Sequence, residues 1–273
     1  MRVLNSIESI AIGSFDGIHK GHLALISKVD GVVIIERNRA SLTPGYKRTS
    51  FIEQPCFFYH LEKIKGLSAK VFIQRLMEDF PNLKRIVVGY DFEFGYKKEG
   101  NILLLQELFD GEVIVIKEVK SGSISVHTQI IKEYLSKGNI KLVTNLLARR
   151  FLLMGQVVSG QGLGKRELVP TLNLKVEAYQ LPKEGVYATR TQIDGCWLNS
   201  VTFLGHRVTT DGFFAVESYI LDRDIGIVSG RVSIEFVDAI RENKKFESLG
   251  QLKQQIQNDI QKAKKRLKGL ICV

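Results

Sequence analysis

Residues 9–22 read Ser-Ile-Ala-Ile-Gly-Ser-Phe-Asp-Gly-Ile-His-Lys-Gly-His, and they decide the fold of the first half of the chain. The run from Glu8 to Phe15, with Ser9-Ile10-Ala11-Ile12-Gly13 at its centre, is short and largely apolar, which predicts a buried strand. Residues 21–29 then carry leucines and an isoleucine at helical spacing, and residues 31–35 form a second apolar run. Strand, helix and strand at this spacing predict a parallel βαβ unit.

The segment from Gly13 to His22 lies where the first predicted strand passes into the predicted helix. Free backbone N–H groups at such a junction suit phosphate, and its glycines let the backbone approach a ligand closely. His19 and His22 are three apart, so they share a helix face and can donate hydrogen bonds to phosphate oxygens. The structural alternative is a glycine-rich turn with incidental histidines, and a two-histidine metal site lacks an evident third ligand. We interpret the segment as a nucleotide-phosphate site.

Further elements divide the chain into two predicted domains. In the first domain we expect a helix over residues 68–80 with Ser68 as its N-cap, strands over 85–89 and 112–118, and one or two helices over 128–149. Beyond residue 150 the chain becomes rich in β-branched and aromatic residues, with candidate strands over 151–158, 185–193, 197–203, 213–221 and 230–237. Such short strands predict a small antiparallel barrel or sandwich, followed by a helix over 248–267. The predicted domains are residues 1–149 and 150–273.

Composition narrows the class of protein. The 273 residues are 44% hydrophobic and 25% charged, as in an ordinary globular protein. No apolar run approaches the ~18–20 residues that span a bilayer, and the first six residues lack the apolar core of a signal peptide. The three cysteines, Cys56, Cys196 and Cys272, form no Cys-x-x-Cys pair, which favours a reducing cytoplasm.

The net charge of +10 is concentrated near the C-terminal end. From Arg241 onward there are nine Lys or Arg and three Asp or Glu, which gives +6. Apolar residues recur there at helical spacing, and Phe246 is the one aromatic residue. Because stacking on bases needs interleaved aromatic residues, a solvated helix face is favoured over a nucleic-acid surface. We expect small-molecule partners, with neither a membrane nor a nucleic acid among them.

The run Gly-x-Phe-Asp-Gly-x-His-x-Gly-His resembles the (H/T)xGH nucleotidyltransferases, specifically the bacterial bifunctional riboflavin kinase/FMN adenylyltransferase family. Residues 88–95, Val-Gly-Tyr-Asp-Phe-Glu-Phe-Gly, followed by Gly100-Asn101, are similar to a second motif of that family. The resemblance implies flavin binding by Asp91, Phe92 and Asn101. It implies ATP binding by Gly13, Phe15, Asp16, Gly17, His19, Gly21 and His22, with His19 and His22 also catalytic.

Residues 124–132, Ile-Ser-Val-His-Thr-Gln-Ile-Ile-Lys, partly match the family's I-S-S-T-x-x-R signature. The match implies that Thr128 and Lys132 bind the ATP phosphates, with Lys132 as a point charge in place of a bidentate arginine. The chain departs from the family pattern at Glu93, where an arginine is usual. It departs again at residues 35–39, where Ile-Glu-Arg-Asn-Arg replaces the family's F-(D/E)-P-H-P.

The run from Gly160 to Lys165 is not a P-loop, because its glycine-to-lysine spacing is too short and Arg166 follows. With Pro170-Thr171 and Asn173 it instead resembles the riboflavin kinase module. That resemblance implies ATP binding by Gly160, Gly162, Gly164 and Thr171. Thr171 and Asn173 are two apart in extended chain, so their hard oxygen atoms face one side and can hold Mg²⁺. The alternative is that they cap a turn after Pro170.

Glu217 is a charged residue within the apolar and aromatic run 214–222. Strand alternation alone makes it an outward-facing surface residue. The resemblance implies that it is the general base for the riboflavin hydroxyl as that hydroxyl attacks the γ-phosphorus of ATP.

The resemblance implies an α/β fold: an N-terminal Rossmann-like parallel-sheet nucleotidyltransferase domain, then a small antiparallel β-barrel with a C-terminal helix. It implies ATP-dependent phosphorylation of riboflavin to FMN and adenylylation of FMN to FAD, with release of pyrophosphate and a requirement for Mg²⁺. Alternatives are an enzyme with one active module, a non-catalytic flavin- or nucleotide-binding regulator, and a cytidylyltransferase.

Overall fold

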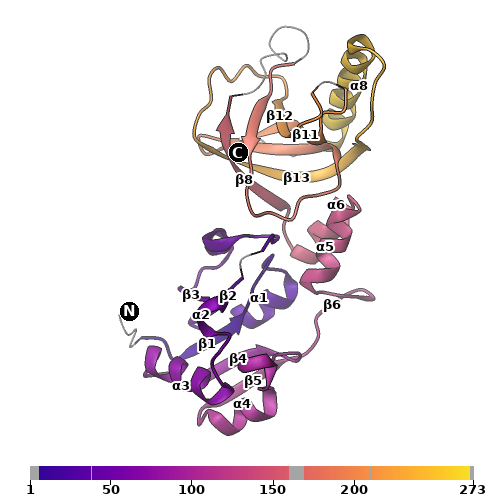
Figure 1. Ribbon diagram of the computed structural model, residues 1–273. Helices are drawn as coiled ribbons and strands as arrows, with labels where there is room; N and C mark the ends of the chain where they lie inside the picture. Colours follow the sequence, from indigo (N-terminus) through magenta and orange to yellow (C-terminus); the bar gives the residue numbers. More distant parts are fainter. Residues whose placement is uncertain (1–5, 38, 160–168, 210, 271–273) are drawn as a thin grey trace. The chain divides into compact units, whose positions relative to one another are not determined.

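The computed structural model describes residues 6–37, 39–159, 169–209 and 211–270. The chain folds into two compact units, Met1–Thr128 and Gln129–Val273. Figure 1 shows that each unit has its own sheet, and each unit also has its own apolar clusters.

The first unit is built on a parallel five-stranded sheet of order β3-β2-β1-β4-β5. Its strands are β1 (Ser9–Gly13), β2 (Gly31–Glu36), β3 (Cys56–His60), β4 (Arg85–Gly89) and β5 (Glu112–Ile116). The α-helices are α1 (Lys20–Ile26), α2 (Leu61–Ile64), α3 (Ala69–Asp79) and α4 (Ile102–Leu108), with 3₁₀ turns η1 (Gly45–Phe51) and η2 (Tyr96–Lys98). A small hairpin, β6 (Lys120–Ser121) and β7 (Ile124–Ser125), follows β5. The predicted βαβ unit, β1-α1-β2, is confirmed.

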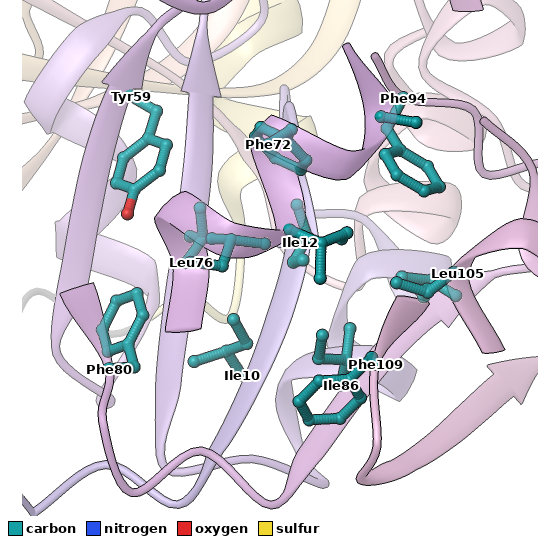
Figure 2. Packing of buried hydrophobic residues seen from close by; sticks show 14 of the residues in the cluster. Ile10, Ile12, Tyr59, Phe72, Leu76, Phe80, Ile86, Phe94, Leu105 and Phe109 are labelled. Atoms are coloured by element: carbon teal, nitrogen blue, oxygen red, sulfur yellow. The ribbon is translucent and has the colours of Figure 1, made fainter. Parts of the chain in front are cut away.

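One apolar cluster joins the sheet of the first unit to α3 and α4. Figure 2 shows Ile10, Ile12 and Ile86 of the strands facing Phe72 and Leu76 of α3. The helical prediction over residues 68–80 is confirmed within two residues, and the Ser68 side chain caps the helix by accepting a hydrogen bond from the Val71 N–H at 3.3 Å. A second cluster, on the other face of the sheet, contains Phe15 and Ile18 from the segment between β1 and α1.

The second unit is a closed barrel with helices packed on it. Its strands are β8 (Phe151–Val158), β9 (Leu172–Lys175), β10 (Gly185–Ile193), β11 (Cys196–His206), β12 (Phe214–Ile220) and β13 (Arg231–Glu242), in the order β10-β11-β12-β9-β8-β13. α5 (Thr128–Ser136) and α6 (Ile140–Leu147) precede the barrel, and α8 (Leu249–Leu267) follows it. The sequence left barrel and sandwich open, and the structure is a barrel.

The barrel interior holds hydroxyl groups among its apolar side chains. Five fully buried residues form one network with O–O distances of 2.8–3.3 Å: Thr189, Thr191, Ser200, Thr202 and Ser218. Each hydroxyl has a partner within the network, so the cost of burying these groups is offset. Ser218 points inward, which places its neighbour Glu217 on the outer face of β12.

Candidate active sites

Residues 13–22, the candidate phosphate loop, lead from the end of β1 into α1 in an unusual backbone conformation. Phe15, Gly17 and Ile18 have φ of 46°, 94° and 45°, in the left-handed region that non-glycine residues rarely adopt. Burial of the Phe15 and Ile18 side chains holds this conformation in place. Strain of this kind concentrates at ligand-binding turns.

The two histidines of this loop stack on one another. Their ring centroids are 3.6 Å apart with an interplanar angle of 19°. His19 is the N-cap of α1, and its Nδ1 accepts a hydrogen bond from the His22 backbone N–H at 3.3 Å. A neutral imidazole that accepts at Nδ1 carries its proton at Nε2, so His19 presents Nε2–H as a donor. A Cβ at Gly21 would lie 3.1 Å from the His19 ring, which accounts for the glycine there.

Both imidazoles are neutral at physiological pH. Burial lowers the pKa of His19 to about 3, and the charge of His127 contributes to this shift. The pKa of His22 is also well below its ordinary value, first through burial and then because a proton on His22 would interact unfavourably with His19, Arg48 and His127. The pair can therefore act on a phosphate as aligned N–H dipoles, and it cannot supply a full positive charge.

Asp16 and Thr128 fasten the phosphate loop to neighbouring segments. The Asp16 carboxylate accepts a hydrogen bond from the Thr43 N–H at 3.0 Å, and the Thr128 hydroxyl donates to the Asp16 carbonyl at 2.9 Å. The sequence predicted both residues as ATP ligands, and in the described structure each has a role in shaping the loop. Lys132 lies one turn further along α5, in the second unit.

The predicted flavin residues follow the carboxyl end of β4. Phe92 stacks on Phe94 at 5.4 Å and packs against the core, while Asp91 is exposed. Asn101 is the N-cap of α4, where its Oδ1 accepts from the Leu104 N–H at 3.1 Å. Glu93, at the family's arginine position, forms an ion pair with Lys98.

The segments that follow β1 and β4 start at the same edge of the parallel sheet. β1 lies between β2 and β4, so the strand order reverses there. Gly13 ends β1 and Gly89 ends β4, and the side chains discussed above follow these two strand ends. Ligands of open α/β sheets bind at the carboxyl ends of strands where the order reverses.

The second candidate site lies on the outer face of the barrel. Glu217 of β12 is directly opposite Asn173 of β9 in antiparallel register, so their side chains emerge side by side. Thr171 lies two residues before Asn173, and the Asn173 Nδ2 is 3.5 Å from the Thr171 carbonyl. The barrel therefore brings together three residues, of which Glu217 is far from the other two in sequence.

The Glu217 carboxylate is half-buried beside an arginine. Burial raises its pKa, and the Arg207 guanidinium, 3.1 Å away, opposes that rise. Arg207 also forms an ion pair with Asp211 at 2.9 Å. A carboxylate with a raised pKa is a stronger proton acceptor than an exposed one, as general-base chemistry requires. The predicted ATP ligands Gly160, Gly162 and Gly164 lie outside the described residues.

Sequence reasoning missed Arg48, which lies in η1 and is 2% exposed. Its guanidinium forms an ion pair with Glu36. Nothing in the local pattern around Lys47-Arg48 indicates burial. Sequence reasoning also missed the pairing of Tyr90 with His127, whose Oη and Nε2 are 3.0 Å apart.

Known proteins match this chain in two separate regions, one for each of the two candidate sites. A family model described as FAD synthetase matches residues 37–130, and one described as riboflavin kinase matches residues 147–267. A protein of Buchnera aphidicola named bifunctional riboflavin kinase/FMN adenylyltransferase is 30% identical over 95% of this chain and 93% of its own length. The chain belongs to the bifunctional riboflavin kinase/FMN adenylyltransferase family. Relatives with the same name from Haemophilus influenzae and Escherichia coli are 28% and 27% identical, over 94% and 92% of this chain and 93% and 90% of their own lengths.

Among solved structures, a crystal structure titled macrolide-efflux protein from Streptococcus pneumoniae superposes with a TM-score of 0.83 at 26% identity. It covers 96% of this chain and 95% of its own. In the described part of this chain, no helix has the length and hydropathy needed to cross a bilayer.

Proposed function

We propose that this chain is a transferase that makes flavin cofactors in two ATP-dependent steps. The barrel unit phosphorylates riboflavin to FMN, and the parallel-sheet unit transfers AMP from ATP to FMN, which gives FAD and pyrophosphate. One observation carries the proposal. The stacked His19 and His22 lie in the first unit, where the FAD synthetase model matches, and Glu217 lies opposite Asn173 in the barrel, where the riboflavin kinase model matches.

Adenylyl transfer at the first site needs no protein nucleophile. An FMN phosphate oxygen attacks the α-phosphorus of ATP, and the bond to the pyrophosphate breaks. His19 and His22 donate hydrogen bonds to the phosphate oxygens on which charge develops, because each is a neutral imidazole with an N–H to offer. The glycines and the left-handed turn bring backbone N–H groups toward the same oxygens. Asp91, Phe92 and Asn101 form the flavin side of this site, and Thr128 and Lys132 assist at the phosphates.

Phosphoryl transfer at the second site uses Glu217. The carboxylate accepts the proton of the riboflavin primary hydroxyl as its oxygen attacks the γ-phosphorus, and ADP leaves. Burial favours proton uptake by Glu217 because it raises the pKa of the carboxylate, while Arg207 keeps the group ionised before the reaction.

Thr171 and Asn173 fit a magnesium ion. Their hydroxyl and amide oxygens are hard ligands, and Mg²⁺ bound with nucleotide takes few protein ligands because phosphates and waters fill the rest. When bound, the ion neutralises charge on the transferred phosphate. Gly160, Gly162 and Gly164 complete the ATP contacts of this module in the proposal. We place the boundary between the modules near residue 149, which the start of the riboflavin kinase match at residue 147 supports. We also propose a cytoplasmic location.

Chromatography of products from riboflavin, ATP and Mg²⁺ tests the function. The wild-type chain is expected to give FMN and then FAD. Absence of FMN refutes the kinase assignment, and FMN without FAD refutes the transferase assignment alone. Glu217→Gln is expected to abolish FMN formation but still convert supplied FMN to FAD. His22→Ala is expected to do the reverse, which also separates a two-module enzyme from one with a single active module.

A further inference from the structure

Among the described residues of the first unit, three buried side-chain polar atoms have no hydrogen-bond partner. They are His22 Nδ1, Ser41 Oγ and Arg48 Nε. Ser41 and Arg48 are 4% and 2% exposed. Buried polar groups usually have a partner, so each of these three atoms has unused capacity for a hydrogen bond.

The three residues belong to one neighbourhood. Arg48 pairs with Glu36, which follows two residues after Ile34, the partner of Gly13 in the β1–β2 pairing. The Arg48 charge also contributes to the lowered pKa of His22. The segment that carries Ser41 and Arg48 is joined to the phosphate loop by the buried hydrogen bond from Thr43 to Asp16. The unsatisfied atoms therefore border the loop already assigned to phosphate.

Arg48 is held in a fixed orientation. Its Nη1 donates to the Glu36 carboxylate and to the Gly45 carbonyl, the latter at 3.3 Å. Glu36 ends β2, next to β1. These contacts occupy one end of the guanidinium and leave the Nε–H edge buried without an acceptor among the described residues. A guanidinium stays charged at all physiological pH values, so Arg48 offers the full positive charge that the neutral imidazoles lack.

We propose that Arg48, Ser41 and His22 form a phosphate subsite of the adenylyl-transfer site. Arg48 Nε–H, the Ser41 hydroxyl and His22 Nδ1–H each donate to a phosphate oxygen. Glu36 is a positioning residue that holds the guanidinium. The ligand is a nucleotide phosphate group, which can come from the polyphosphate chain of ATP or from the phosphate of FMN. This inference rests on the proposed function of the first unit.

Calorimetric titration of the full chain with pyrophosphate, ATP and FMN, each added alone, tests the subsite. The variants are Arg48→Lys, which keeps the charge but loses the Nε–H edge, and Ser41→Ala, which removes one hydroxyl from a small side chain. Arg85→Lys is the matched control, since Arg85 pairs with Glu112 through an exposed ion pair at the opposite end of the sheet. Melting temperature is measured for every variant.

We expect Arg48→Lys to weaken binding at least tenfold and Ser41→Ala about threefold, with the control within twofold of wild type. Weaker pyrophosphate and ATP binding assigns the subsite to the ATP polyphosphate, and weaker FMN binding alone assigns it to the FMN phosphate. Unchanged dissociation constants for either variant overturn the proposal. If the melting temperature of Arg48→Lys falls while its dissociation constants stay unchanged, Arg48 serves only as the partner of Glu36. Failure of the proposed function is a separate result, in which the wild-type chain makes no FAD whether or not it binds pyrophosphate.

Discussion

Acidification is expected to destabilise the first unit through His19. Burial lowers the pKa of His19 from 6.5 to about 3, so between these values the unfolded chain binds a proton that the folded chain does not. The contribution of His19 to stability is therefore complete above pH 6.5 and is lost as the pH falls toward 3. Between pH 7 and pH 5 the loss is about 2 kcal/mol for this one group. His22 adds to it in the same direction, because its pKa is also lowered.

His19→Asn isolates this effect. Asparagine is a good N-cap, so its side chain can keep the hydrogen bond from the His22 N–H while losing the titrating group. Amide hydrogen exchange of β1 and β4 reports on the first unit by itself. The protection factors of the two proteins are compared at pH 7 and again at pH 5. The protection factor of the wild type should fall about 25-fold more than that of the variant over this range. Equal losses in the two proteins would show that His19 titrates normally and that its burial has no energetic consequence.

Three further predictions concern the barrel and the loops. Arg207→Gln should move the acidic limb of the kinase pH–rate profile to higher pH, because the cation that opposes the raised pKa of Glu217 is removed; an unmoved limb contradicts the pairing. Gly95→Ala should destabilise the first unit by about 3 kcal/mol, since φ is 75° and the new Cβ would lie 2.7 Å from a backbone nitrogen. Gly122→Ala, with φ of 63° and open space around it, should cost only about 1 kcal/mol, and urea titration measures the free energy of unfolding of both variants. Asn173→Ala should raise the Mg²⁺ concentration needed for half-maximal kinase activity at least tenfold and leave FAD formation from supplied FMN unchanged; an unchanged requirement removes Asn173 from the metal site.

The local pattern of apolar residues was sufficient to predict the helices and strands with strong periodicity. Strands β1, β2 and β4, and the helices α3 and α8, were predicted within two residues at each end. β3, α4 and β9 were not predicted. β9 is four residues long and β3 is a short apolar run at the sheet edge, and such runs carry no periodic signal that separates a strand from a loop. Their partners in the folded sheet define them as strands.

The phosphate loop shows what sequence can indicate about a site. Glycine and histidine spacing singled out the turn and its two histidines, because these residues are contiguous; their role in phosphate binding stays a prediction. The protonation state of His19 and His22 was not predictable, since it depends on burial and on charges from His127 and Arg48, which are distant in sequence.

Sequence alone was enough to predict a glycine- and histidine-rich turn after a buried strand at residues 13–22, and a β-rich domain after a βαβ domain. These conclusions depend on neighbours in the chain, whose spacing is fixed by covalent geometry. The closure of the second domain into a barrel, the position of Glu217 opposite Asn173 and the burial of Arg48 beside Glu36 became known from the folded structure. Each of these depends on how distant segments come together, and the register of strand pairing is set by how whole side-chain faces are buried.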